Sequence, residues 1–296
     1  MNTSSIRRLP AHTWAGLGIL AVGQALLAAG NRWMATWLTP VMWTGVILFM
    51  DGVVFRLRGR SWIMSRRREL PLLVLASVGV WLIFEAYNLY LRNWRYEGLP
   101  ASSLARDLGY FWSFATIMPG VFEASDLCLA VLERRRAAVR IPNSMGRVGP
   151  PWAWSIAGIA MITIPLALPP ETAALLFGAV WIGFFLLLDP LNEMLGLSAL
   201  RQRWRLGDRR LVHSLLLGGM ICGLLWETWN HQAAAASGAY WIYIFPEALR
   251  PLGLRFGQMP VMGLLGFPPF ALELFGFYQF IRQILGGDRV YSPGHS

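Results

Sequence analysis

A set of polar and aromatic motifs occurs twice along this chain, in the same order and inside apolar segments. The offset between partners grows only from 138 to 150 residues. Four two-part matches in register indicate an internal duplication, so we expect two similar halves, 1–145 and 146–296. The pairs are Trp43-x-Gly45-x-x-Leu48-x-x-Asp51 with Trp181-x-Gly183-x-x-Leu186-x-x-Asp189, Glu85-x-x-Asn88 with Glu227-x-x-Asn230, Trp94-x-Tyr96 with Trp241-x-Tyr243, and Pro119-x-x-x-Glu123 with Pro269-x-x-x-Glu273.

The composition places these motifs in a membrane. Hydrophobic residues make up 55% of the chain and charged residues only 14%, whereas soluble domains carry about 25% charged residues. Runs of about 20 apolar residues, each long enough to span a bilayer, occur eight times. The predicted fold class is therefore all-α, a polytopic membrane protein with about eight transmembrane helices in two parallel four-helix repeats. The predicted helices are 13–30, 33–50, 70–90, 109–132, the shorter 152–168, 172–195, 211–231 and 260–284.

The arginines predict the orientation of these helices. Every basic side chain other than histidine is an arginine, and 20 of the 26 fall at the termini or in the loops 51–69, 133–150 and 201–210. The positive-inside rule then puts both termini in the cytoplasm, and we expect a bacterial inner-membrane protein. The net charge of +10 does not indicate nucleic-acid binding, because it lies in short loops between apolar runs. The opposite side carries only Arg32, Arg92, Arg95, Arg106, Arg250 and Arg255.

Carboxylates inside the predicted spans are the strongest functional signal. An ionised carboxylate at the centre of a membrane helix costs about 2.5–3.5 kcal/mol, so such residues usually serve a function. We expect all four in the middle to outer part of the membrane, near one axis, with a site between the two halves. Asn88 and Asn230 share a helix face with the preceding glutamate and can hold its carboxyl in one protonation state. The candidate catalytic residues are Glu85, Glu123, Glu227 and Glu273.

Two candidate residues have no counterpart across the duplication. His231 faces Leu89 in the alignment of the halves, and Asp126 faces Gly276. This divergence predicts one asymmetric site, with His231 and Asp126 as supporting residues. The alternative for the Glu-Asn pairs is interhelical hydrogen bonding.

Other residues favour structural roles. Asp51 and Asp189 end predicted helices beside arginine-rich loops, which favours charge pairs with arginine. Trp43 and Trp181 at helical spacing from them favour core packing. Cys128 and Cys222 lie in apolar runs and are typical of buried, unpaired thiols. We expect no metal and no cofactor.

Each half resembles the membrane-integral carotenoid enzymes of the lycopene cyclase type, which also occur as paired halves. The matching positions are Phe84-Glu85 or Trp226-Glu227, Trp94-x-Tyr96 or Trp241-x-Tyr243, and Pro119-x-x-x-Glu123 or Pro269-x-x-x-Glu273. The chain departs from that family in having Glu for Asp, a single Glu for a Glu-Glu pair, and four helices per half rather than three. The segment 259–270 is also similar to a group of uncharacterised bacterial multi-pass membrane proteins.

The resemblance implies acid–base chemistry on an isoprenoid or carotenoid-like lipid, of the cyclase or hydratase type. In that chemistry a carboxylic acid protonates a polyene, aromatic faces shield the cation, and a second carboxylate removes a proton. The resemblance assigns the acid to Glu227 or Glu273. It also implies that the substrate is lined by Trp94, Tyr96, Trp226, Trp229, Trp241 and Tyr243.

Two alternatives stay open at this point. The same carboxylates are typical of proton- or cation-coupled transporters and channels. The chain is also compatible with a non-catalytic membrane subunit. In each case we expect membrane lipids as partners, and for the enzyme a lipophilic small molecule.

Overall fold

The computed structural model describes residues 8–135, 149–244, 246 and 251–287. Six arginines of the predicted distribution lie outside these ranges: Arg7, Arg136, Arg140, Arg147, Arg250 and Arg289. The helices of the first half are α1 (Ala11–Ala28), α2 (Arg32–Arg58), α3 (Trp62–Ser65), α4 (Leu70–Leu91), α5 (Ser103–Ala115) and α6 (Ile117–Arg135). Those of the second half are α7 (Pro151–Ala167), α8 (Pro170–Ala173), η2 (Ala174–Leu176), α9 (Phe177–Met194), α10 (Leu200–Arg205), α11 (Arg210–Ala235), η4 (Pro251–Gly253), α12 (Val261–Leu264) and α13 (Phe267–Ile284).

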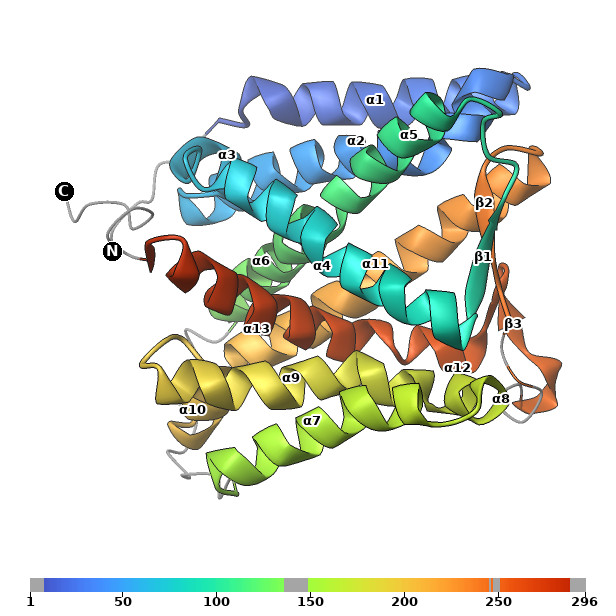
Figure 1. The fold of residues 1–296 in the computed structure, drawn as a ribbon. Coiled ribbons are helices and arrows are strands. Elements are labelled where there is room, and N and C mark those ends of the chain that lie inside the picture. The colour runs from blue at the N-terminus through green and yellow to red at the C-terminus, as the bar shows by residue number, and fades with distance from the viewer. Residues whose placement is uncertain (1–7, 136–148, 245, 247–250, 288–296) are drawn as a thin grey trace.

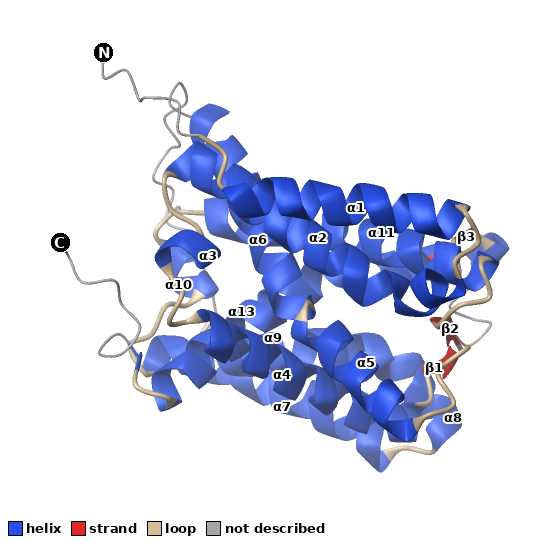
Figure 2. Cartoon of the chain, turned by 90° about the horizontal axis from the view of Figure 1, so that it is seen from above, coloured by secondary structure: helices blue, strands red, loops and turns tan. Residues whose placement is uncertain are grey.

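The described chain is mostly helical, as a polytopic membrane protein should be. Seven helical segments are long and apolar enough to cross a membrane, and α7 is a shorter apolar helix of the same character. Figures 1 and 2 show the long helices side by side, with α3 and α10 at one end of the bundle. Four short strands lie at the other end: β1 (Trp94–Glu97), β2 (Tyr240–Tyr243), β3 (Arg255–Phe256) and β4 (Met259–Pro260).

Two predicted helices are each divided in the structure. The predicted span 109–132 is α5 followed by α6, and the predicted span 260–284 is α12 followed by α13. Both divisions lie at prolines, because proline has no N–H for the helical hydrogen bond and its ring clashes with the preceding turn. Glu123 and Glu273 therefore lie in the second turn of α6 and α13, not deep within long helices as predicted.

Local signals explain where α2 begins and ends. The Asn31 side chain accepts a hydrogen bond of 2.8 Å from the Met34 amide, which caps the first turn. The sequence predicted an end at residue 50, but α2 continues to Arg58. It ends at Gly59, which adopts the left-handed conformation with φ of 76°. Glycine adopts this conformation without steric cost and commonly ends helices.

Glycines allow two pairs of helices to pack very closely. A Cβ atom on Gly16 of α1 would lie 2.5 Å from the Gly45 carbonyl oxygen of α2. A Cβ atom on Gly158 of α7 would lie 2.7 Å from the Gly183 carbonyl oxygen of α9. Small residues at helix contacts are typical of membrane proteins, where close backbone approach supplies the attraction.

A buried polar cluster joins the two halves at the end opposite the strands. Glu69 precedes α4, is 3% exposed, and accepts a hydrogen bond of 2.7 Å from Nε of Arg282 near the end of α13. The hydroxyl of Tyr278, also on α13, donates to the same carboxylate oxygen. This cluster fixes α4 against α13, and both helices contribute residues to the cavity described below.

Candidate functional site

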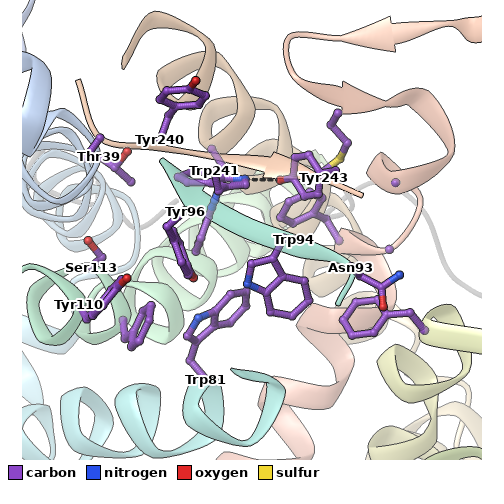
Figure 3. Close-up of a pocket in the computed structure, with 18 of the residues that line it drawn as sticks. Thr39, Trp81, Asn93, Trp94, Tyr96, Tyr110, Ser113, Tyr240, Trp241 and Tyr243 are labelled. Carbon is purple, nitrogen blue, oxygen red and sulfur yellow. Dashed lines mark hydrogen bonds between the residues drawn. The ribbon is translucent and has the colours of Figure 1, made fainter. Parts of the chain in front are cut away.

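The two Trp-x-Tyr motifs pair with each other. Strands β1 and β2 form an antiparallel ladder in which Trp94 lies opposite Tyr243, and Tyr96 lies opposite Trp241. Each tryptophan of one motif therefore faces the tyrosine of the other. The amino-acid sequence did not predict strands here, because four residues are too few for a period-two pattern. Figure 3 shows the four side chains around one space.

Two asparagines hold the ladder onto the helices. Nδ2 of Asn88 on α4 donates to the Trp94 carbonyl oxygen at 2.9 Å, and its Oδ1 accepts from the Trp94 amide at 3.1 Å. Asn230 on α11 makes the same pair of bonds with the Trp241 backbone, both at 2.9 Å. The predicted contact between asparagine and glutamate is longer than these backbone bonds: Nδ2 of Asn230 lies 3.3 Å from Oε2 of Glu227.

Glu85 lies directly behind one of the ladder tyrosines. Its Oε1 accepts three hydrogen bonds, from the Tyr96 hydroxyl at 2.5 Å, from Trp81 Nε1 at 2.9 Å and from Trp94 Nε1 at 3.2 Å. Trp81 precedes Glu85 by four residues on α4, so both share one helix face. That spacing was visible in the sequence, although Trp81 was not predicted as a site residue.

Glu227 occupies the corresponding position behind the other tyrosine, but its surroundings differ. The side chain is fully buried, and Oε1 accepts hydrogen bonds from the backbone amides of Gln258 and of Met259, the latter at 3.1 Å. The Tyr243 hydroxyl also interacts with this carboxyl. The oxygen of the same hydroxyl accepts a hydrogen bond of 2.5 Å from Trp241 Nε1. The two carboxyl–tyrosine pairs, Glu85–Tyr96 and Glu227–Tyr243, are named the dyads below.

The dyads border a cavity of about 360 Å³, within the size range of small-molecule sites. Both tyrosines line it, and the glutamates lie behind them. Five of the six predicted lining residues do line it. Trp229 does not, since it packs edge-on against Trp43 at 5.2 Å. The cavity lies between the halves, with walls from α2, α4, α5, α9, α11, α12 and α13.

Aromatic rings form most of the cavity wall. The Trp226 ring centroid lies 5.8 Å from that of Trp81 and 5.6 Å from that of Trp241. Trp181, predicted as core packing, also lines the cavity and packs at 4.9 Å on Phe270. Aromatic faces carry negative charge density and attract cations. The wall can therefore hold a long apolar ligand and stabilise positive charge that develops on it.

We expect the ladder tyrosines to stay protonated at alkaline pH. Burial raises the pKa of both Tyr96 and Tyr243 well above the ordinary value of 10.0, and the neighbouring glutamates raise it further. A group whose pKa is raised in the folded state stabilises the protein below its unfolded pKa. That stability is lost as the pH rises through the folded pKa.

The measurement is the ultraviolet absorbance of tyrosinate during an alkaline titration. The wild type and a Tyr96→Phe, Tyr243→Phe double variant should give equal absorbance through the ordinary tyrosine range, about pH 10. A smaller signal in the double variant at that pH, with both proteins folded, would contradict the expected shift.

The other two predicted carboxylates lie away from the cavity. Glu123 is 1% exposed, and its carboxyl interacts with that of Asp51. Glu273 is fully buried, and its Oε1 accepts from the Phe184 amide of α9 at 3.1 Å. None of the four carboxylates lines the cavity itself: Glu85 and Glu227 lie behind its tyrosines, whereas Glu123 and Glu273 contact other residues.

The two supporting residues without counterparts are also outside the cavity. Asp126 on α6 forms an ion pair of 2.9 Å with Arg58 and accepts from Trp62 Nε1 at 3.2 Å, near α3. His231 is exposed on α11. Neither contributes to the asymmetry predicted from the sequence. The asymmetry instead lies in the donors: side chains donate to Glu85, whereas Glu227 also accepts from the backbone amides of Gln258 and Met259.

The repeated aspartates cap short helices rather than pairing with arginine side chains. Asp51 accepts from the Ile63 amide of α3 at 2.8 Å, and its other carboxylate oxygen lies 2.8 Å from Nε2 of His12. Asp189 accepts from the amides of Leu200 and Arg201 of α10 at 2.6 and 2.9 Å. Neither aspartate forms a salt bridge with an arginine side chain within the described ranges, although Arg201 interacts electrostatically with Asp189. Unpaired amides at a helix start are the physical reason for these positions.

No group of three or more His, Cys, Asp or Glu side chains within the described ranges could hold a metal ion. Cys128 and Cys222 are both free thiols. Comparison with protein-family models, with curated proteins and with solved structures finds no match for this chain.

Proposed function

We propose that this protein is an intramembrane enzyme that acts by acid–base chemistry on an isoprenoid or carotenoid-like lipid in the cavity between its halves. One observation carries the proposal: the Tyr96 hydroxyl, which lines the cavity, bonds at 2.5 Å to the Glu85 carboxyl behind it. A proton held by the carboxyl can reach the cavity through this hydroxyl.

The second dyad supplies the complementary step. A proton from the Glu85–Tyr96 dyad adds to one carbon of a substrate double bond, whose π electrons form the new C–H bond. The cation left on the adjacent carbon is stabilised by the faces of Trp81 and Trp226 and is attacked by a second double bond, which closes a ring. A neighbouring carbon then loses a proton to the Tyr243–Glu227 dyad. One proton enters and one leaves, so the cyclisation needs no oxidant.

We propose an eight-helix topology in which residues 1–145 and 146–296 form parallel repeats and α7 is the eighth span. Three sets of equivalent contacts support this. The asparagine clamps on β1 and β2 match, the glycine contacts of α1–α2 match those of α7–α9, and the aspartate caps of α3 and α10 match. The arginines near α3 and α10 support a cytoplasmic position for that end, in a bacterial inner membrane.

The test measures turnover after loss of the ladder hydroxyls. Purified protein in liposomes receives acyclic polyenes, both a neutral one such as lycopene and one with an acidic head such as farnesyl phosphate, and the products are separated by chromatography. Tyr96→Phe and Tyr243→Phe should each lower product formation by about 10²-fold or more, because each removes the group that delivers or accepts the proton. Tyr90→Phe is the matched control, since the Tyr90 hydroxyl donates to the Leu168 carbonyl outside the cavity.

Equal product formation by Tyr96→Phe and the wild type would contradict the proposal. Transport is the second candidate, because the buried carboxyl of Glu123 lies beside Asp51, which in turn contacts the partly exposed His12. A chain of such groups can carry protons. Proton uptake into liposomes that depends on Glu123, without any change in an added polyene, would favour that function.

A further inference from the structure

The cavity is polar at one end. Figure 3 shows Thr39 of α2 with Tyr110 and Ser113 of α5 on the same side of the ladder. Arg106, one helical turn before Tyr110, also lines the cavity and interacts electrostatically with its hydroxyl. Arg106 is the one charged residue among the described residues that line the cavity.

The opposite end is apolar and reaches the surface. Leu175, Met262 and Leu265 line the cavity from η2, α12 and the residue after α12, and they are 41%, 43% and 57% exposed. Exposed aliphatic side chains on spanning segments contact lipid tails, so the cavity opens sideways toward the hydrocarbon. Asn93 is the polar residue on this side, and its amide nitrogen donates to the Ala174 carbonyl oxygen at 3.1 Å.

Two groups at the polar end lack partners that would explain their positions. Thr39 is 7% exposed, and no other described residue offers its Oγ1 a hydrogen bond. Arg106 is half-buried and forms no ion pair within the described part of the chain. Its guanidinium makes one long hydrogen bond, of 3.5 Å, to the Ala101 carbonyl oxygen, and the neighbouring Asp107 is exposed. Leaving such groups unpaired beside an apolar cavity is costly.

We propose that the cavity binds an anionic amphiphile, with its phosphate or carboxylate head at Arg106 and Thr39 and its chain between the aromatic rings. Arg106 supplies the positive charge and a planar set of donors that suits both anions. Thr39 supplies a further donor. The chain leaves through the apolar opening beside Leu265. This inference rests on the proposed function and specifies its substrate class: an isoprenoid acid or phosphate rather than a neutral hydrocarbon.

The test compares ligands that differ only in the head group. Binding of all-trans retinoic acid and of retinol to the detergent-solubilised protein is followed by quenching of tryptophan fluorescence. Farnesyl phosphate and farnesol are then tested as competitors, which distinguishes a phosphate head from a carboxylate head. The wild type should bind at least one anion about tenfold more tightly than the matching alcohol. Arg106→Gln should abolish this preference, and Arg106→Lys should retain part of it.

Two further variants separate head-group binding from other effects. Arg95→Gln removes an exposed arginine from the same end of the protein and should keep the full preference for anions. Thr39→Val should weaken binding of the anion about threefold, the loss of one hydrogen bond. A melting curve for each variant checks that it is folded.

Three results would overturn the proposal: equal affinity for both anions and their alcohols in the wild type, no binding of any of the four, or an anion preference that survives in Arg106→Gln. Failure of the proposed reaction gives a different pattern, because binding with an anion preference would then persist while no lipid is converted. The head-group assignment and the acid–base assignment are therefore tested separately.

Discussion

Glu85→Gln is expected to lower turnover of the lipid by about 10²–10⁴-fold, the usual contribution of a general acid or base, while leaving lipid binding nearly unchanged. Gln keeps the size of the side chain and its Oε1 can still accept from Tyr96, Trp81 and Trp94. What it loses is the ability to hold and release a proton. Because Glu85 lies behind the cavity wall, the ligand does not contact it directly.

The measurement is product formation by the variant beside ligand affinity from tryptophan quenching. Glu123→Gln and Glu273→Gln provide the comparison, since both carboxyls are buried away from the cavity. These two are expected to change the melting temperature more than the turnover. If Glu85→Gln retains wild-type turnover, or if Glu123→Gln loses as much as Glu85→Gln, the dyads are not the catalytic groups.

Gly16→Ala and Gly158→Ala are each expected to destabilise the protein by about 1–3 kcal/mol, the usual cost of overpacking. The new Cβ would lie 2.5 Å from the Gly45 carbonyl oxygen in the first case, and 2.5 Å from the Leu187 amide nitrogen in the second. Both neighbours are backbone atoms that cannot rotate away. The helices of each pair must therefore separate, which loses contacts along α1–α2 or α7–α9.

Thermal unfolding in detergent measures this effect. Gly18→Ala and Gly79→Ala are the matched controls, because a Cβ at either position meets no atom within 4 Å. These controls should be neutral or slightly stabilising, since alanine has the higher helix propensity. Equal melting temperatures for Gly16→Ala and Gly18→Ala would mean that the close contact of α1 with α2 is not required.

The sequence predicted the helical spans well where apolar length alone decides. The runs at 13–30, 70–90 and 211–231 correspond to α1, α4 and α11 within a few residues. The sequence-based prediction was wrong where a helix is broken within an apolar run, as between α5 and α6 near Pro119. A hydropathy pattern counts apolar residues and does not report which prolines break the helix: α2 continues through Pro40 and α9 through Pro190, whereas the helix is broken just before Pro119.

The candidate site was predicted in part. Trp94, Tyr96 and Trp241 do line the cavity, and their part in a reaction stays a prediction. The sequence identified Arg106 only as one of the few arginines on the side of the membrane opposite the two termini. Its position at a cavity depends on how α5 packs against α2, and no local pattern reports that packing.

The amino-acid sequence by itself determined that the chain enters a membrane, which segments are apolar enough to cross it, and which motifs recur. The apolar segments follow from the transfer free energies of their side chains, and the repeated motifs follow from the order of residues along the chain. Only the tertiary structure decided which repeated residues meet. The Trp-x-Tyr motifs pair across the halves while Glu123 and Glu273 stay outside the site, because contact depends on the packing of helices far apart in sequence.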